Sequence, residues 1–85
     1  MYAVYILKSV KDQNLYIGST NNLKRRLAEH ISGKVFSTQN RRPFKLVYCE
    51  LYKSEIDARK REHNLKLRSR ALSQLKSRII HSINY

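Results

Sequence analysis

The sequence predicts an α+β fold, a small three-stranded antiparallel sheet with helices packed against it, in the order β-β-α-β-α-α. Two kinds of pattern predict it. Short segments rich in aromatic and β-branched residues open the chain and recur near its middle. Clusters of N-cap residues precede segments in which leucine and isoleucine recur at helical spacing. The length of 85 residues suits one domain, which we expect to span residues 1–85.

The first two expected elements are the arms of a β-hairpin. Residues 2–7 and residues 15–18 are short apolar runs, and residues 11–14 between them are polar. A strand is therefore expected in each arm, with the polar residues in the connecting loop.

A helix is expected next. Residues 19–22 all suit an N-cap, and Leu23, Leu27 and Ile31 then recur at a spacing of four. Gly33 suits the end of a helix, so the helix is expected to finish at the residue before it. The stripe that begins with Leu23 and Leu27 is expected to face the sheet.

The second half of the chain predicts one more strand and two more helices. Residues 44–52 are rich in Phe, Val, Leu and Tyr, which favours a third strand. Ser54 suits the N-cap of a helix that runs to about Leu67, and Ser69 suits the N-cap of another. The last helix has an apolar stripe formed by Leu72, Leu75 and Ile79.

The charge of the chain predicts a polyanionic partner. Eighteen Lys and Arg residues stand against six acidic residues, which gives a formal net charge of +12. So strong a positive field in a small body favours nucleic acid. An anionic membrane, an acidic protein surface and a merely soluble basic surface stay open as alternatives.

Other classes of protein are disfavoured by simple features of the sequence. Apolar runs fall far short of the roughly 20 residues that span a bilayer, and the chain starts with a strand-like pattern, so a cytoplasmic location is expected. The single cysteine, Cys49, lies in an apolar segment and is expected to fill the core. No CxxC or HExxH spacing is present, which disfavours a tightly held zinc ion.

Two tyrosines are the first candidates for chemistry. Tyr5 and Tyr16 fall on the two arms of the hairpin, and in a nearly symmetric register they project from one face near Gly18. Taken alone, two strand tyrosines are more often packing residues, so this alternative stays open.

Arg26 and His30 are the next candidates. They lie four residues apart and therefore share a helix face, where we expect them at the rim of the core beside the hairpin. An arginine there can grip a phosphate, and an imidazole can donate to a phosphate oxygen or move a proton. Ordinary surface charge and a satisfied rim histidine are the alternatives.

Glu62 is the most informative acid. It lies four residues after Ala58 and three before Leu65, beside the face of its helix that is expected to pack inward. One interpretation is a simple helical ion pair with Lys66. The other is a ligand for a loosely held Mg²⁺ or Mn²⁺ ion, which one carboxylate and substrate phosphates can bind.

These residues together resemble the GIY-YIG nuclease superfamily. The motifs in order are Ala3-Val4-Tyr5, Tyr16-Ile17-Gly18, the segment from Asn22 to His30 that contains Arg26, and Glu62 ahead of Leu65-Lys66. The resemblance covers practically the whole chain and is nearest to compact single-domain bacterial members, similar to the N-terminal domain of the excision-repair nuclease subunit. The first triplet departs from the family pattern at Ala3 and Val4.

The resemblance implies a metal-dependent endonuclease acting on DNA in preference to RNA. It implies that Tyr5 and Tyr16 are the paired tyrosines, Arg26 the phosphate-binding arginine, His30 a supporting side chain and Glu62 the ligand of one Mg²⁺ or Mn²⁺ ion. Further cations are expected to contact the nucleic acid backbone: Arg25, Lys34, Arg41, Arg42, Arg59, Arg61, Arg68 and Arg70.

Two rival functions stay open beside the nuclease. One is a binding module of the same fold without turnover, and the other is a basic adaptor for an acidic protein or a membrane surface. The sequence also leaves open the strandedness of the substrate, the oligomeric state and a protein partner for targeting.

Overall fold

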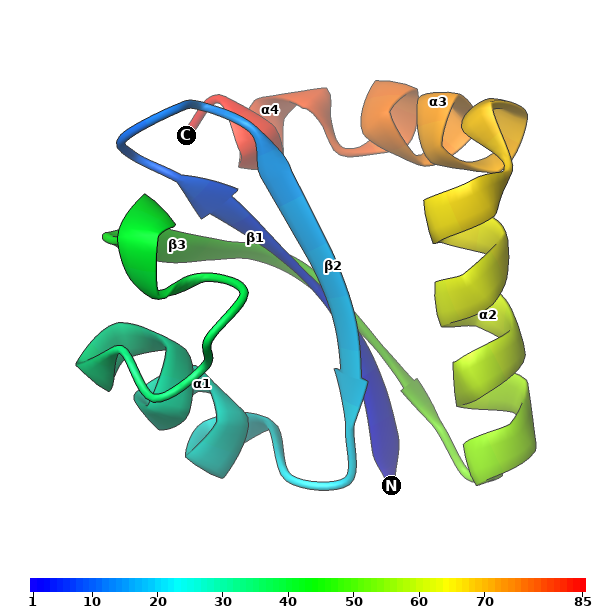
Figure 1. Cartoon of the computed structure of the whole chain (residues 1–85). Coiled ribbons are helices and arrows are strands. Elements are labelled where there is room, and N and C mark those ends of the chain that lie inside the picture. Colours follow the sequence, from blue (N-terminus) through cyan, green and yellow to red (C-terminus); the bar gives the residue numbers. More distant parts are fainter.

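The computed structural model of the chain describes residues 1–85 and has the predicted α+β architecture (Figure 1). The elements in order are β1 (Tyr2–Ser9), β2 (Leu15–Thr20), α1 (Leu23–Ser32), the 3-10 turn η1 (Gln39–Arg41), β3 (Phe44–Tyr52), α2 (Glu55–Leu67), α3 (Ser69–Arg78) and α4 (Ile80–Ile83). The predicted order β-β-α-β-α-α is confirmed, with η1 and the short α4 added to it.

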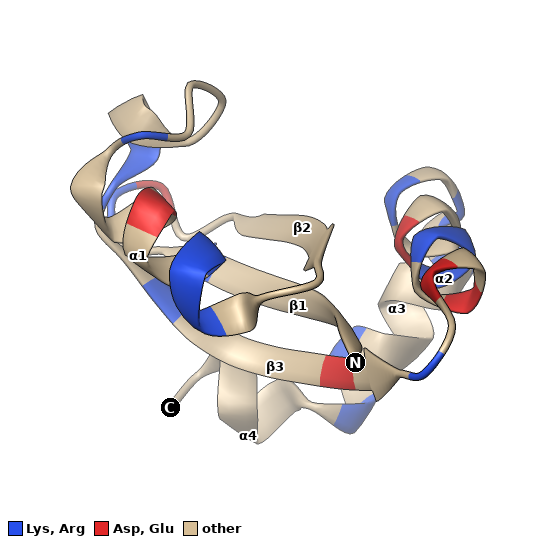
Figure 2. Cartoon of the chain, turned by 90° about the horizontal axis from the view of Figure 1, so that it is seen from below, with Lys and Arg blue, Asp and Glu red and all other residues tan.

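The sheet is antiparallel with the strand order β2-β1-β3, so β1 lies in the centre and β2 forms one edge. Helix α1 lies on one side of the sheet, and α3 and α4 lie on the other (Figure 2). Alternate residues of β1 therefore project from opposite faces of the sheet, and the β1 side chains on both faces are mostly buried.

We call the side that meets α2 and α3 the apolar face. Val4, Ile6 and Ile17 project from it and pack against Ala58, Leu65 and Leu75 in one hydrophobic cluster. The opposite side, from which Tyr5 and Ser9 project toward α1 and the segment 34–42, we call the polar face. Its buried partners are His30 and Thr38.

Helix α1 corrects one prediction. Ile31 is 67% exposed and does not face the sheet, whereas His30, which we expected at the rim, is buried. The reason is geometric: each four-residue step turns the stripe by about 40°, so Ile31 ends about 80° from Leu23. His30, seven residues after Leu23, returns to within about 20° of it.

Three further expectations differ from the structure. Cys49 is exposed, because its neighbours Tyr48 and Glu50 point to the apolar face and Cys49 must point the other way from the edge strand β3. The last helix does not continue through Ile79, whose non-helical backbone separates α3 from α4. Ser69 is the first residue of α3 and not its N-cap, whereas Ser54 is the N-cap residue of α2 as predicted, although its side chain makes no capping hydrogen bond.

None of the helices combines the length and the apolar composition that crossing a membrane requires.

Candidate active site

The two tyrosines lie on the polar face. Tyr5 is paired with Gly18 and Leu7 with Tyr16 across the β1–β2 ladder, so Tyr5 and Tyr16 project from the same side. Their ring centroids are 6.4 Å apart. The hairpin register alone therefore brings both phenols to the edge of the sheet formed by β2.

Gly18 makes room for Tyr5. A Cβ atom at this position would lie 2.6 Å from Cζ of Tyr5, which is closer than real Cβ contacts allow. The ring of Tyr5 therefore crosses directly over the backbone of β2, and its hydroxyl lies at the position where a side chain of residue 18 would begin. Any other residue at this position would displace the phenol.

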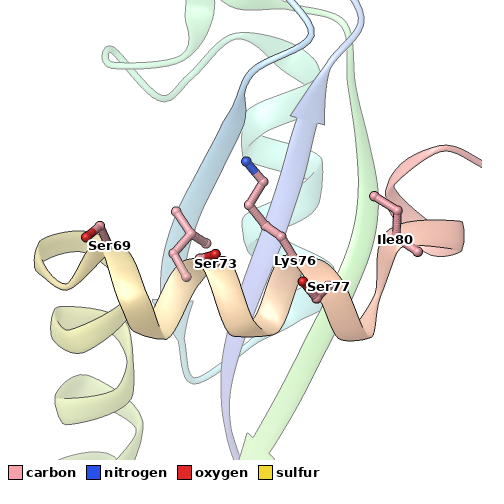
Figure 3. A pocket seen from close by; sticks show the side chains of 6 residues that line it. Ser69, Ser73, Lys76, Ser77 and Ile80 are labelled. Carbon is pink, nitrogen blue, oxygen red and sulfur yellow. The ribbon is translucent and has the colours of Figure 1, made fainter.

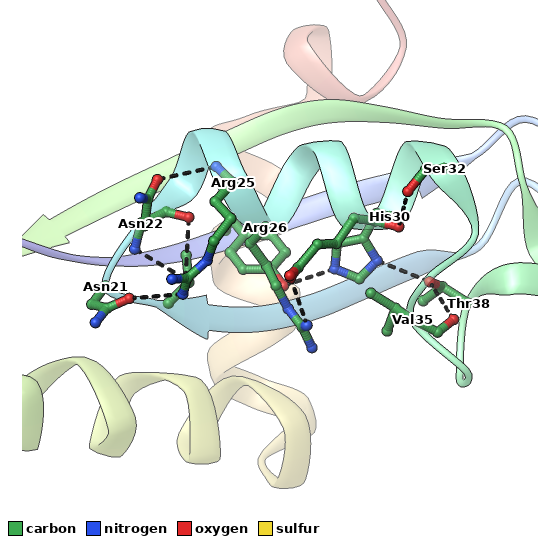
Figure 4. A network of polar contacts seen from close by, with 11 residues as sticks. Asn21, Asn22, Arg25, Arg26, His30, Ser32, Val35 and Thr38 are labelled. Atoms are coloured by element: carbon green, nitrogen blue, oxygen red, sulfur yellow. Dashed lines mark hydrogen bonds and ion pairs between the residues drawn. The ribbon is translucent and has the colours of Figure 1, made fainter.

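Helix α1 brings His30 to the same place. Asn22 caps the helix by accepting a hydrogen bond from the backbone N–H of Arg25 at 3.0 Å, and this fixes where the helix begins. His30 Nε2 lies 2.9 Å from the hydroxyl of Tyr5, and Nδ1 lies 2.8 Å from the hydroxyl of Thr38 (Figure 4). Burial first and the charge of Arg26 second lower the pKa of His30, so its ring is neutral at pH 7.

Arg26 lies one helical turn before His30 and is half-buried. It donates to Oε1 of Glu29 at 3.1 Å, and its charge also interacts with Tyr5. Burial raises the pKa of Tyr5 to about 12 although Arg26 opposes the shift. Tyr5 is therefore a neutral phenol, and Arg26 stays charged beside it.

Glu62 reaches the site from the other side of β2. It lies on α2 between the buried residues Ala58 and Leu65, as predicted. Its Oε1 accepts a hydrogen bond at 2.5 Å from Ser19, the residue after Gly18, and its Oε2 pairs with Lys66 at 2.8 Å. Burial opposes ionisation of this carboxyl, but the hydrogen bonds from Lys66 and Ser19 outweigh it and lower the pKa of Glu62.

The five candidate residues therefore gather around the edge strand β2. Tyr5, Tyr16, Arg26 and His30 lie on the polar face, and Glu62 is held beside Gly18 by its bond to Ser19. The charge of Glu62 contributes to the raised pKa of Tyr5, as does Tyr16. The helical ion pair of Glu62 with Lys66 is confirmed, and the same carboxylate borders the site.

Comparison with known proteins decides the family. The chain matches the family model described as "GIY-YIG catalytic domain" over residues 1–76. The chain belongs to this family. Membership of the GIY-YIG family indicates the nuclease superfamily that the sequence motifs resemble.

The relatives extend over the whole chain. It is 41% identical to a UPF0213 protein of Clostridium perfringens, over 100% of this chain and 94% of that protein. It is 45% identical to a UPF0213 protein of Natronomonas pharaonis, over 80% of each chain. The solution NMR structure of a UPF0213 protein from Bacillus halodurans matches the fold with a TM-score of 0.57 and 39% sequence identity. The match covers 91% of this chain and 84% of the Bacillus halodurans chain. The GIY-YIG fold is therefore shared by UPF0213 proteins.

The donor set of this GIY-YIG domain suits a weakly held divalent ion. No group of three or more His, Cys, Asp or Glu side chains gathers to hold a metal. Glu62 offers an ionised, half-buried carboxylate, which is the oxygen donor that Mg²⁺ and Mn²⁺ prefer. One carboxylate together with water and substrate phosphates is a usual Mg²⁺ environment. Lys66 pairs with one oxygen of that carboxylate, Oε2, but its side chain is exposed and free to move away.

The cations predicted to contact nucleic acid fall into two groups. Arg41 pairs with Asp12 at 2.7 Å, and Arg61 donates two hydrogen bonds to Glu50, so both are engaged inside the domain. The other predicted cations are exposed: Arg25, Lys34, Arg42, Arg59, Arg68 and Arg70. Most lie on or beside α1 and α2, the two helices on either side of β2 in Figure 2.

A hollow elsewhere on the GIY-YIG domain holds no candidate residue. It runs along α3 and is lined by Ser69, Ser73, Lys76, Ser77 and Ile80, together with Leu72 (Figure 3). Its lining consists of three serine hydroxyls, one lysine and two apolar side chains. The candidate residues lie instead around β2.

Sequence reasoning missed two members of the site. Ser19 was expected as part of the N-cap cluster, but it lies inside β2, one residue before the end of the strand, and donates a hydrogen bond to Glu62. Thr38, which bonds to His30, lies in a segment without periodicity, and nothing in the sequence marks it. Both contacts join residues far apart in the chain, and only the packing of α1 and α2 reveals them.

Proposed function

We propose that this chain is a divalent-metal-dependent endonuclease that hydrolyses phosphodiester bonds in nucleic acid, with DNA favoured over RNA. The observation that carries the proposal is the meeting of two phenols, a guanidinium and an ionised carboxylate around Gly18. Hydrolysis of a phosphodiester needs a held phosphate, a proton acceptor for the attacking water and a means to neutralise charge on the leaving oxygen. Each need has a candidate group in this set.

Arg26 is the group proposed to hold the scissile phosphate. It is half-buried, it is charged, and its only acidic partner, Glu29, is also partly exposed at 33%. A guanidinium can bind two oxygens of a phosphate at once, which a surface carboxylate does not prevent. The net charge of +12 draws the polyanion to this surface.

The two tyrosines divide the remaining roles. The Tyr5 hydroxyl is hydrogen-bonded to His30, and the Tyr5 side chain is only 1% exposed. Tyr5 therefore contributes by its contact with Arg26 from the interior of the domain. The Tyr16 hydroxyl makes no hydrogen bond within the chain and is not buried, so it is open to water. We therefore assign Tyr16 as the proton acceptor for the attacking water.

Glu62 is the residue proposed to hold the divalent ion. When bound, Mg²⁺ or Mn²⁺ supplies neutralisation of the negative charge that develops on the leaving oxygen. Ser19 keeps the carboxylate in place by its hydrogen bond to Oε1. Oε2 becomes available to the ion when the Lys66 ammonium group moves away from it.

The test measures cleavage and binding separately. Purified protein is incubated with labelled single-stranded and duplex DNA and with matched RNA, in Mg²⁺, Mn²⁺ or EDTA, while fluorescence anisotropy reports binding. Glu62→Ala should reduce cleavage to the level seen in EDTA and leave backbone binding intact. Arg26→Ala should lower cleavage by about 100- to 1,000-fold, as expected for loss of one group that stabilises the transition state.

Glu55→Ala is the matched control, because Glu55 is an exposed acid on the same helix and pairs only with Arg59. It should cleave like the wild type. Binding of nucleic acid without any cleavage would replace the nuclease by the non-catalytic module. Absence of binding at moderate salt would favour the basic adaptor for an acidic protein or a membrane surface.

A further inference from the structure

We propose that Thr38 is a positioning residue of the candidate site, whose hydroxyl accepts the Nδ1–H of His30 and so keeps Nε2 free to accept the proton of the Tyr5 hydroxyl. The effect on cleavage rests on the proposed nuclease function, whereas the hydrogen-bond arrangement itself does not.

The first support is the enclosure of these three side chains. Tyr5 and His30 are each 1% exposed and Thr38 is 0% exposed, so water does not compete for their hydrogen bonds. No buried side-chain nitrogen or oxygen in the chain lacks a partner. A buried network of this kind holds one geometry, because each misplaced proton would leave a polar atom unsatisfied.

The direction of the hydrogen bonds follows from the last acceptor in the chain of contacts. The hydroxyl of Thr38 lies 3.4 Å from the carbonyl oxygen of Val35, which can only accept. When Thr38 gives its proton to that carbonyl, its oxygen must accept from Nδ1 of His30. A neutral imidazole carries one proton, so Nε2 is then bare and accepts from Tyr5.

Thr38 is itself held by the turn between β1 and β2. The hydroxyl of Ser9, fully buried, donates to the carbonyl of Arg41 at 2.7 Å, and Asp12 binds the guanidinium of Arg41. Lys11 donates to the carbonyl of Asn40 at 3.0 Å. These bonds fasten η1 to the hairpin, so Thr38 meets His30 from a fixed position.

The arrangement matters for the residue proposed to hold the phosphate. With its proton directed to His30, the Tyr5 oxygen keeps its lone pairs for a donor, and Arg26 is the donor that interacts with it. In the reversed arrangement, His30 would donate to the Tyr5 oxygen, and the phenol proton would point toward Arg26. Two donors, the phenol O–H and the guanidinium N–H, would then face each other and repel. Thr38 thus acts on Arg26 through two other side chains.

The experiment reads the tautomer of His30 directly. Two-bond ¹H–¹⁵N correlation spectra of the histidine rings at neutral pH distinguish a proton on Nδ1 from one on Nε2, with the exposed His63 and His81 as internal references. Wild-type protein should show His30 protonated on Nδ1. A proton on Nε2 in the wild type overturns the proposal, and this measurement needs no variant.

Thr38→Val and Thr38→Ser complete the test. Valine keeps the shape of threonine without the hydroxyl, so His30 should shift toward the Nε2–H tautomer, whereas serine should keep the wild-type spectrum. In the cleavage assay, Thr38→Val should lower kcat by about 10- to 100-fold, the range for partners that orient a functional histidine, with little change in KM. Thr38→Ser should restore most of it.

The two proposals fail in different ways. A wild-type protein that cleaves nothing but shows the Nδ1–H tautomer contradicts the nuclease and supports the role of Thr38 in orienting His30. A Thr38→Val protein with an unchanged tautomer and unchanged kcat contradicts the positioning role and leaves the nuclease intact.

Discussion

Both faces of the sheet are buried along β1 but are held by different interactions. On the apolar face, Val4 packs against Leu65 in a cluster without polar atoms, while on the polar face Tyr5, His30 and Thr38 are joined by hydrogen bonds. Apolar burial stabilises in proportion to area and tolerates small shifts, whereas a buried polar network is satisfied in one arrangement only. The apolar face therefore stabilises the fold, and the polar face fixes the site.

The central strand β1 serves both faces at once. Val4 and Ile6 point to the apolar face, and Tyr5 between them points to the polar face. A shift of register by one residue would exchange these sets, burying the phenol among leucines. The stability of the hairpin and the position of Tyr5 thus depend on the same ladder.

The largest effect is expected from the apolar face. Leu65→Ala should lower the free energy of unfolding by about 2–5 kcal/mol, because it removes a fully buried side chain and leaves a cavity. That is a large share of the roughly 5–15 kcal/mol typical of a domain. Urea denaturation followed by circular dichroism measures it.

Leu67→Ala is the matched control on the same helix. Leu67 is 69% exposed, so its loss should change stability by less than about 0.5 kcal/mol. Similar losses for both variants would contradict the division between the faces, since α2 would then not be held by its inward residues.

A smaller effect on stability, but a large one on the site, is expected at Gly18. Gly18→Ala places a methyl group 2.6 Å from Cζ of Tyr5, and a ring fixed in a central strand cannot yield easily. We expect a loss of about 1–3 kcal/mol from this overpacking. Cleavage should fall well beyond the effect of that instability, because the phenol leaves His30 and Arg26.

A double-mutant cycle isolates this contact. In a Tyr5→Leu background the ring is gone, so Gly18→Ala should cost much less, and the difference measures the coupling of the two positions. An equal cost in both backgrounds would mean that the methyl group meets something other than Tyr5.

The sequence was sufficient for the elements of the fold because their signals are local. The N-cap at Asn22 and the left-handed Gly33 delimit α1 from within a few residues, and residues 44–52 form β3 as predicted. The burial of His30 in place of Ile31 was missed, because a stripe at a spacing of four drifts around a helix with 3.6 residues per turn.

The site was only partly accessible to the same reasoning. The shared face of Tyr5 and Tyr16 follows from hairpin register, and it could be predicted. The bond from Ser19 to Glu62 depends on where α2 crosses the edge of the sheet, and the bond from Thr38 to His30 depends on an irregular segment. Neither is encoded in a periodic pattern.

The smallest effect compares one tyrosine from each face at alkaline pH. Burial raises the pKa of Tyr5 to about 12, and burial together with a hydrogen bond to Glu50 raises the pKa of Tyr48 to about 12 as well. Both folded values exceed the ordinary pKa of about 10, so the fold favours the neutral phenols. Their contribution to stability is complete below about pH 10 and is lost as the pH rises toward 12.

Replacement of either tyrosine by phenylalanine should make the unfolding free energy less sensitive to pH in this window, as measured by urea denaturation at about pH 9 and about pH 11. The two sites should differ in their response to one further change. Glu50→Gln removes the carboxylate beside Tyr48 and should lower the pKa of Tyr48, seen as earlier phenolate absorbance, while Tyr5 keeps titrating near 12. A matching shift at Tyr5 would show that the two faces are electrostatically coupled through β1, because no direct contact joins Tyr5 to Glu50.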